Sequence, residues 1–453
     1  MATVRRAAVA GAFYPGDPRQ LAAEVEDLLG GVEQLEPRFG YPKALVVPHA
    51  GYIYSGPVAA AAFDQLAAAR GIVKRVVLLG PVHRVPVRGL ALPGADVFET
   101  PLGRIPVDAR AAEMIADLSQ VVRSEAAHAM EHSLEVQLPF LQKILRDFAL
   151  LPLAVGSASV DEVAEVIERL WGGPETLIVV STDLSHYHVY DEARRIDGAT
   201  LVRIASFATD LDHEEACGAT PLNGMLNVAK KKRLAISLVA ACNSGDTAGG
   251  RGRVVGYSAF ALREDGEVRT EDAGRTLVSI ARAAISHQLG LGAAPRIDGA
   301  PWLAQAGATF VTLTKCGQLR GCIGSLEPAR ALGEDVAANA AGAAFRDPRF
   351  PAVTHDEWPQ CSVEVSLLST PKPVRFADEA DLLAQVRAGE DGIILEYNGK
   401  RATYLPQVWE GLPDKRRFFD ELKRKAGLPA DTRLARCRLW RYRVVKWRQE
   451  ALQ

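Results

Sequence analysis

Histidine, aspartate and cysteine residues follow several Val- and Leu-rich runs in the first half of the sequence. The run KALVVP leads to His49, RVVLLGPV to His83, TLIVVST to Asp183 and His186, and LAISLVAA to Cys242. Two neutral imidazoles and a thiolate can hold a divalent or cuprous metal, and a remaining Asp and His pair can move a proton on a bound substrate. These residue types predict a metal-dependent catalytic site, provided that the fold brings them together.

An alternation of short apolar runs and helical segments between residue 43 and about residue 262 predicts the elements that carry these side chains. Such alternation is typical of βαβ units around a mainly parallel sheet flanked by helices, an α/β fold. The predicted strands are 44–47, 75–79, 150–154, 177–180, 234–240 and 256–262, and the predicted helices are 18–29, 57–69, 111–118, 132–147 and 160–170. Because the carboxyl ends of parallel neighbours form one rim, the five residues are expected to line a single cleft.

A purely structural role is the alternative explanation for the same residues. Asp183 and Ser185 are good helix N-cap types, and Cys242 could be an inert buried thiol. Capping does not explain why three imidazoles stand at strand ends, because an isolated histidine has no preference for such positions. We therefore favour the site over the structural explanation.

A second polar cluster lies in the segment AAHAMEHSLEVQLPF. If this segment is one helix, His128 and His132 stand one turn apart, with Glu131 and Glu135 close by, as in helical metal pairs. The segment lacks the HExxH order, however, and EHSLEVQLPF also has the pattern of an amphipathic helix with its leucines directed inward. We expect His132, together with Tyr54, to line the substrate pocket rather than to bind the metal.

The composition is that of an ordinary globular protein. Of 453 residues, 48% are apolar and 24% charged, and the length predicts two domains. The formal net charge of -2 provides no global field for nucleic acid, so we do not expect nucleic-acid binding. The 6 cysteines form no CxxC pair, and the sequence has neither a signal-peptide pattern nor a run of roughly 18 apolar residues. We expect a reduced, cytoplasmic protein with no membrane partner.

The chain changes character after Leu262. The polar segment REDGEVRTEDAG is the best linker in the sequence, and it precedes an amphipathic helix predicted at 275–288. Beyond it, the strand candidates ATFVTLTK, CSVEVSLL and GIILEY alternate with helices and turns, which is typical of an α+β domain with an antiparallel sheet. We therefore place the two domains at 1–264 and 265–453.

The second half contains one motif with chemical character, GQLRGCIGSLEP. It places Cys322 between two glycines and near Arg320, a cation of the kind that lowers the pKa of a neighbouring thiol. A turn with a packed cysteine is the commoner explanation of Gly-Cys-x-Gly.

The C-terminal run RLARCRLWRYRVVKWRQ combines arginine with tryptophan and could bind RNA, but a solvated face of a half-buried strand explains it as well.

Many motifs of the first half together resemble one family. GAFYPGDP, VVPHAGYIYSGPVAAAAF, LLGPVH, ETPLG, EHSLEVQLPFLQ, STDLSHY and the Cys242 segment resemble the Memo family over residues 1 to about 264. That family is similar to the class III extradiol dioxygenases, which use non-haem iron(II) on an α/β fold with a central sheet. The resemblance implies that His49, His83 and Cys242 hold the metal, that His186 is the acid–base residue and that Asp183 lies beside it.

One ligand departs from the dioxygenase pattern, and this bears on the identity of the metal. The dioxygenases complete their ligand set with a carboxylate, whereas this sequence offers Cys242. A thiolate is softer and favours copper(I), zinc or an electron-rich iron. The resemblance implies mononuclear iron(II) as the cofactor, and the thiolate leaves copper or zinc as alternatives.

The second half resembles the AMMECR family over residues from about 270 to 453. The segments that carry this resemblance are LRGCIG, AAFRDPRFPAV, VEVSLLSTPKPV and DGIILEYNGKRATYLPQVW. Memo-like and AMMECR-like proteins resemble companions of a radical-SAM enzyme, so the fusion resembles an AmmeMemoRadiSam-type system and implies such a partner.

For the whole chain, we expect an oxidoreductase acting on a small molecule. A metal- or phosphopeptide-binding scaffold and a thiol-dependent hydrolase with Cys242 as nucleophile remain open as alternatives.

Overall fold

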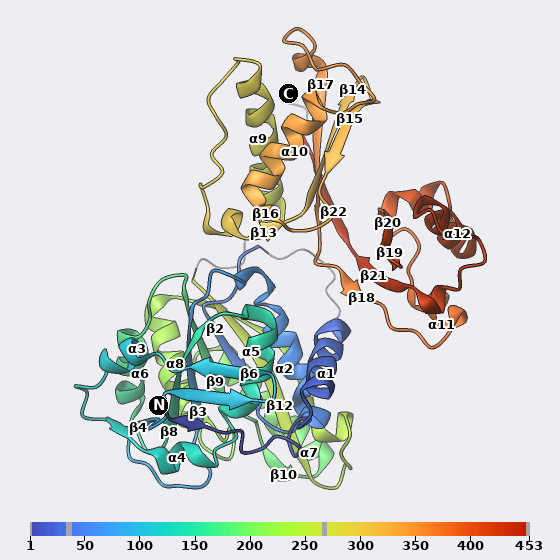
Figure 1. The fold of residues 1–453 in the computed structure, drawn as a ribbon. Coiled ribbons are helices and arrows are strands. Elements are labelled where there is room, and N and C mark those ends of the chain that lie inside the picture. The colour runs from blue at the N-terminus through green and yellow to red at the C-terminus, as the bar shows by residue number, and fades with distance from the viewer. Residues whose placement is uncertain (1, 33–38, 265–269, 450–453) are drawn as a thin grey trace. The chain divides into compact units, whose positions relative to one another are not determined.

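The computed structural model describes residues 2–32, 39–264 and 270–449. The described residues form two compact units (Figure 1). Unit 1 consists of residues 2–32 and 41–264, and unit 2 of residues 39–40 and 270–449. The boundary predicted at residues 264 and 265 borders the range 265–269, which lies outside the described residues. In the described part of the chain, every helix is too short or too polar to cross a membrane.

A nine-stranded mixed sheet forms the centre of unit 1. Its order is β10-β12-β2-β9-β3-β8-β4-β7, and β11 pairs with β12. The neighbours β2, β9, β3 and β8 are parallel, whereas β12 runs antiparallel to β2, β10 and β11. The bounds are β2 (Ala44–Val47), β3 (Arg75–Pro81), β4 (Leu90–Leu92), β7 (Val121–Arg123), β8 (Ala149–Val155), β9 (Thr176–Ser181), β10 (His186–His188), β11 (Ala235–Asn243) and β12 (Val254–Arg263). The predicted α/β class with a mainly parallel centre is confirmed.

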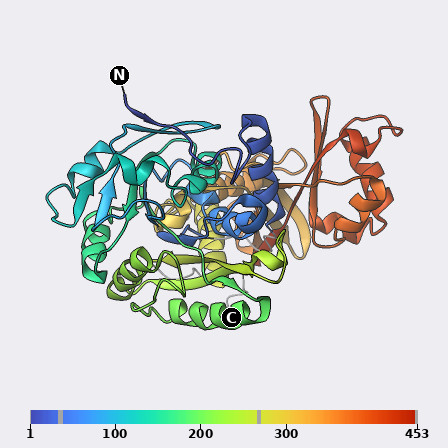
Figure 2. The ribbon, with the colours of Figure 1, turned by 90° about the horizontal axis from the view of Figure 1, so that it is seen from below.

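Helices cover both faces of this sheet and create two separate cores (Figure 2). Alternation along β2 shows the division, because Leu45 and Val47 belong to one core and Ala44 and Val46 to the other. Helices α1 (Pro18–Gly31), α2 (Tyr52–Asp64) and α5 (Leu138–Leu145) cover the first face. Helices α3 (Ala109–Glu113), α6 (Val160–Arg169), α7 (Tyr190–Ala205) and α8 (Ala219–Lys232) cover the second. A small sheet of β1 (Val4–Arg5), β5 (Val97–Thr100) and β6 (Gly103–Pro106) completes unit 1.

Two predicted helices of unit 1 are longer than those in the structure: the helix predicted at 111–118 is α3, which ends at Glu113, and the helix predicted at 132–147 is only partly formed. The structure does not continue a helix from 132 to 147; it forms a turn, a 3-10 helix at Glu135–Gln137 and then α5. The Ser133 carbonyl, which a helix from residue 132 would use as an acceptor, accepts the Ser181 hydroxyl instead, at 2.7 Å. His128 lies in the separate short helix α4 (Glu125–Ala129), so His128 and His132 are not a helical pair.

Unit 2 contains two four-stranded antiparallel sheets, as the α+β pattern predicts, and a two-stranded antiparallel sheet of β13 (Ala306–Gly307) and β16 (Arg330–Ala331). The first has the order β15-β14-β17-β22 and carries α9 and α10 on one face. The second has the order β18-β21-β19-β20 and packs against α11 and α12. The bounds are α9 (Thr270–Gln288), β14 (Thr309–Lys315), β15 (Gln318–Gly324), α10 (Leu332–Phe345), β17 (Cys361–Leu368), β18 (Lys372–Pro373), α11 (Glu379–Gln385), β19 (Gly392–Tyr397), β20 (Lys400–Tyr404), α12 (Lys415–Lys425), β21 (Arg438–Tyr442) and β22 (Val444–Arg448). An apolar contact that includes Leu368 and Tyr442 joins the two sheets.

Candidate metal centre

His49 stands directly beyond the carboxyl end of β2 and is buried, with 2% of its surface exposed. Its Nδ1 lies 2.8 Å from the Ser181 hydroxyl at the end of β9. That hydroxyl donates its proton to the Ser133 carbonyl over 2.7 Å, so it can only accept from His49. In the neutral ring, Nδ1 therefore carries the proton and Nε2 has a free lone pair.

One buried carboxylate, Glu131, orients the other two imidazoles. Its Oε1 lies 2.9 Å from His83 Nδ1 and 3.3 Å from His132 Nδ1, and its Oε2 accepts the His83 backbone N–H at 2.7 Å. Burial alone would raise the pKa of Glu131, but hydrogen bonds from His132, His83 and the Ser133 backbone outweigh it and hold the pKa well below its usual range. The ionised carboxylate thus accepts at the Nδ1 atoms of both rings, and their Nε2 atoms are left for another ligand.

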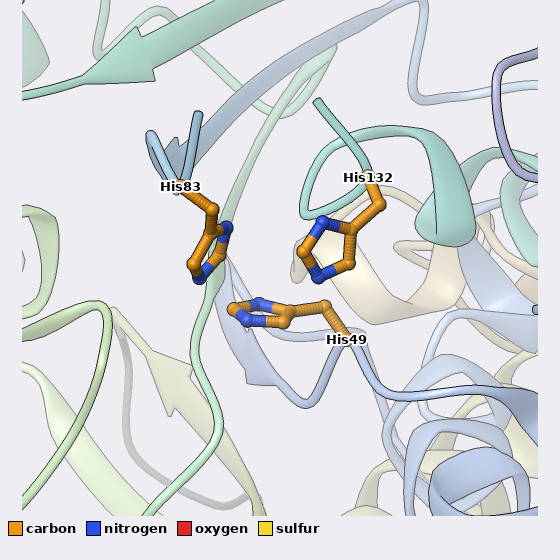
Figure 3. Close-up of side chains that lie close together, drawn as sticks. All are labelled: His49, His83 and His132. Atoms are coloured by element: carbon orange, nitrogen blue, oxygen red, sulfur yellow. The ribbon is translucent and has the colours of Figure 1, made fainter. Parts of the chain in front are cut away.

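The three rings converge on one point at the strand ends (Figure 3). The ring centroids are 4.6 Å apart for His83 and His132, 5.1 Å for His49 and His83, and 5.4 Å for His49 and His132. One nitrogen from each ring lies within 4.8 Å of the other two. Burial, and then the charges of the two neighbouring rings, hold the pKa of His49 well below its ordinary value of 6.5. His49 is therefore neutral at physiological pH, which is the protonation state that binds metal.

Close packing between two segments fixes the positions of the rings. The Ser133 hydroxyl donates to the carbonyl of Pro81 at the end of β3 over 2.9 Å, and this bond ties the loop that carries His132 to the strand that precedes His83. Gly80 permits that approach, because a Cβ there would lie 2.7 Å from the Ser133 Oγ. The ring of Phe13 packs on His132 with a centroid distance of 4.8 Å. The N-terminal segment therefore forms part of the site, although no charged side chain marks it in the sequence.

Cys217 also lies at the site, and the sequence analysis did not select it. Its Sγ is 3.3 Å from His49 Nε2 and accepts the Asp183 backbone N–H at 3.3 Å. Burial and the Asp183 charge raise the pKa of Cys217 to about 12, so the thiol is neutral. The search for polar residues at strand ends did not find Cys217, because this residue precedes helix α8 in EEACGATPLNG and follows no apolar run. The sequence feature that could have indicated Cys217 is its position next to Gly218, the N-cap of this helix.

Cys242, the predicted thiolate ligand, is not brought to this group. Among the described residues, the group whose ligand atoms lie within 4.8 Å of one another is formed by His49, His83 and His132. Cys242 lies on β11, opposite Tyr257 of β12, and β12 separates β11 from β2. Neighbouring strands are about 4.8 Å apart, so this position is about 10 Å from the strand that delivers His49. Cys242 is half-buried, and burial, with the Asp246 charge, raises its pKa to about 11.

The predicted proton-transfer pair stands at the edge of the histidine group. Asp183 is buried and accepts the His49 backbone N–H on Oδ1 at 2.7 Å, while its Oδ2 is 4.0 Å from His49 Nε2. Burial raises the pKa of Asp183 above its ordinary value. His186, on β10, is half-buried. Tyr54, the predicted pocket residue, lies in the first turn of α2 and is 38% exposed.

In unit 2, the motif residues Arg320 and Cys322 belong to the edge strand β15. The Arg320 guanidinium is paired with Glu357, with bonds of 2.8 Å and 2.9 Å. The Cys322 thiol accepts from the Thr312 hydroxyl at 3.3 Å, and the Cys322 backbone N–H donates to Asp347 at 2.8 Å. Arg320 therefore neutralises the Glu357 carboxylate. The hydrogen bonds of Cys322 join the edge strand β15 to Thr312 of β14 and to Asp347, which is a structural role.

The fold and site define an α/β protein with a candidate three-histidine metal centre, joined to a separate α+β unit. Residues 5–261 match the family of Memo-like proteins, which is more than half of the chain, and residues 278–447 match the AMMECR1 family. The chain belongs to the Memo-like family and carries an AMMECR1 domain in the same polypeptide.

Curated relatives agree with this assignment, and two solved structures show a limited likeness to the chain. A MEMO1 family protein of Aquifex aeolicus is 38% identical over 269 residues, covering 56% of this chain and 97% of the relative. A MEMO1 family protein of Metallosphaera sedula is 35% identical over 282 residues, covering 56% and 98%. The crystal structure of an uncharacterized protein from Pyrococcus horikoshii shares 33% identity with a TM-score of 0.36, covering 39% of this chain and 91% of that one. An uncharacterized protein of Escherichia coli K12 has 15% identity and a TM-score of 0.35, covering 48% and 98%.

Proposed function

We propose that unit 1 binds one transition-metal ion through the Nε2 atoms of His49, His83 and His132 and uses it in an oxidoreductase reaction on a small molecule. The observation that carries this proposal is the pairing of each Nδ1 with a protein acceptor, either Ser181 or Glu131. Such outer partners are typical of metal-ligating histidines, because they fix the tautomer and the ring orientation. A histidine cluster with only a packing role would not need all three Nε2 atoms turned toward one point.

The donor set indicates which metals suit the site. Imidazole nitrogens bind zinc, copper, iron and nickel, and the neighbouring Cys217 thiol would shift the preference toward softer ions if it joined the set. We propose iron(II) as the native metal, in line with the resemblance to class III dioxygenases, and copper or zinc as the alternatives. When bound, such a metal supplies Lewis acidity and, for iron or copper, one-electron chemistry.

The residues around the three histidines suit proton transfer and substrate positioning. His186 is half-buried and so can reach both solvent and a substrate, and we assign it the acid–base role. Asp183 holds the His49 backbone and stands within 4.0 Å of the His49 ring, so it positions a ligand and places a carboxylate beside the reacting atoms. Phe13 and Tyr54 supply aromatic walls for a small organic substrate.

A thiol-dependent hydrolase is the weaker alternative. Its nucleophile would be Cys242, but burial raises the pKa of this thiol to about 11, and a protonated thiol is a poor nucleophile at neutral pH.

The union of a Memo-like and an AMMECR1 domain in one chain supports a further proposal, that the protein works with a radical-SAM enzyme. Co-purification of such an enzyme with the chain from its own cells tests this partnership.

Metal analysis of the anaerobically purified protein tests the proposed site. We expect near-stoichiometric metal in the parent protein, and its loss in His49→Ala and His132→Ala. Cys217→Ser and Cys242→Ser form a matched pair: both remove one half-buried thiol of unit 1, but only Cys217 touches His49. We expect weaker metal retention for Cys217→Ser and unchanged retention for Cys242→Ser. Absence of metal from the parent, or its retention in His132→Ala, would contradict the proposal.

A further inference from the structure

Strand β11 forms a long edge of the central sheet of unit 1. It runs for nine residues, and among the described strands it pairs only with β12. Ala235, Ser237, Leu238 and Ala241 are exposed along it, whereas every residue of the interior strands β2 and β9 is buried. The outer backbone N–H and C=O groups of β11 therefore face away from the sheet with no strand beside them.

The two edges of the sheet differ in the features that prevent an edge strand from pairing with a strand of another molecule. At the far end, β7 has only three residues and ends in Arg123. Short edge strands and charged side chains are devices that prevent edge-to-edge association. Strand β11, with the sequence AISLVAACN, has neither charge nor proline, and its Leu238 is 48% exposed. Its pairing with β12 shifts register between Leu238 and Ala240, but the strand continues on both sides of this irregularity. This edge has the features of a strand that pairs with another strand.

We propose that β11 is the interface of a homodimer, in which β11 of a second copy of this chain pairs antiparallel with it and joins the two central sheets. Antiparallel pairing of one strand with its identical copy follows from a two-fold axis, so each copy presents the same surface to the other. Self-pairing of a charged strand would place like charges opposite one another, and β11 contains none. The neutrality of the strand thus suits a second copy better than a charged partner.

The flanking helices make the surface large enough for a stable dimer. Helix α2 packs against β11 on the first face of the sheet and α7 on the second. Val202 of α7 is 69% exposed, so the apolar surface continues beyond the strand. Nine residues span about 30 Å, and two helices of about 10 Å diameter give a width of at least about 20 Å, so the flank measures about 600 Å² or more per copy. This is of the same order as the area per partner of a standard interface, about 800 Å².

Sedimentation analysis of the full chain with matched lysine variants tests this proposal. We expect the parent protein to be dimeric, and Leu238→Lys and Ala241→Lys to raise the dimer dissociation constant at least tenfold, because lysine on an edge strand opposes pairing. Val122→Lys on β7 is the control, since it makes the same kind of change at a 39% exposed position of the opposite edge. It should leave the dimer intact. Circular dichroism shows whether each variant is folded, and Ala241→Lys serves if Leu238→Lys does not fold.

Hydrogen exchange gives a second readout that a general loss of stability would not mimic. Amides of residues 235–243 should exchange more slowly as the protein concentration rises, while those of β7 should not change. A parent protein that is monomeric at all concentrations would overturn the proposal. So would protection of β11 that is independent of concentration, which would indicate that unit 2 covers the edge within one chain. A dimer that persists in both folded lysine variants would place the interface elsewhere.

Discussion

Glu131 Oε1 lies 2.9 Å from Nδ1 of His83, and the same oxygen is 3.3 Å from Nδ1 of His132. One carboxylate therefore sets the tautomer of two imidazoles of the candidate metal centre. Its own backbone contacts, from the N–H groups of His132 and Ser133, fix the carboxylate in turn. The orientation of the site thus depends on a residue that does not face the metal position.

The Glu131→Gln variant should bind metal more weakly while leaving all three histidines in place. The amide oxygen can take the place of Oε1, but the NH2 group then faces the His83 backbone N–H that Oε2 accepts, and a neutral amide is a weaker acceptor for both rings than a carboxylate. Loss of such a partner costs about 10–100-fold in metal affinity. Titration of the metal-free protein measures the change. Glu125→Gln, an exposed change in the preceding helix α4, should bind metal like the parent. Equal affinities for the two variants would show that Glu131 does not position the ligands.

The strand-end pattern predicted His49 and His83, because each follows an apolar run that becomes a parallel strand of the sheet centre. The same pattern led to Cys242, which is outside the group of ligand atoms within 4.8 Å among the described residues, so its role as a ligand stays a prediction. The pattern treats every strand end as part of one rim, whereas β12 pairs antiparallel between β2 and β11 and displaces the end of β11 sideways. Pairing order is a tertiary property, and the sequence pattern alone does not contain it.

Cys217 was not predicted at all, and His132 was predicted to line the pocket but not to belong to the metal group, for a different reason. Both belong to irregular segments whose positions depend on side-chain bonds, such as the Ser133 hydroxyl to Pro81 and the Asp183 N–H to Cys217. Such bonds join residues far apart in the chain and leave no periodic signal. The predicted helix does not begin at His132 for the same cause, because the Ser133 hydroxyl bonds to Pro81 and the Ser133 carbonyl accepts from Ser181, both outside the segment.

Acid should destabilise unit 1 through His128. This ring is buried, and burial lowers its pKa to about 4, although its hydrogen bond to the Ala91 carbonyl opposes the shift. The unfolded chain binds the proton below about pH 6.5, while the folded chain does not until about pH 4. The free energy of unfolding is therefore constant above this window and falls as the pH is lowered through it, by about 3 kcal/mol for this group.

The His128→Gln variant should lose this part of the acid sensitivity. Glutamine can still donate to the Ala91 carbonyl, but it does not titrate. Urea unfolding followed by circular dichroism at pH 7 and pH 4 measures the difference between parent and variant. The loss of unfolding free energy between these pH values should be smaller for His128→Gln than for the parent, whereas His355→Gln, on an exposed histidine, should follow the parent. Identical losses for the parent and His128→Gln would refute the assignment.

Arg5 anchors the N-terminal strand to the segment that carries Glu131. Its guanidinium pairs with the buried Glu135 and donates to the His128 and Glu131 carbonyls at 3.0 Å and 2.7 Å. Arg5→Ala leaves the Glu135 charge buried without its cation, and removing one partner of a buried pair costs about 3–5 kcal/mol. Arg104→Ala breaks an exposed pair with Glu99 and should cost about 0–1 kcal/mol. Equal unfolding free energies for the two variants, measured in urea, would contradict this view.

In unit 2, the first glycine of the GCIG motif has a packing role that a methyl group should abolish. A Cβ on Gly321 would lie 2.1 Å from the Ala343 carbonyl oxygen of α10, and backbone atoms cannot move aside as a flexible side chain can. Gly321→Ala must therefore push β15 away from α10, an overpacking change that costs about 1–3 kcal/mol or more. Gly411→Ala is the control, because its nearest atom, the Val408 carbonyl oxygen, is 3.9 Å away. Thermal unfolding should show a lower midpoint for Gly321→Ala only. If both variants unfold like the parent, the glycine is retained for another reason, and the backbone beside Cys322 becomes the place to look for bound ligands.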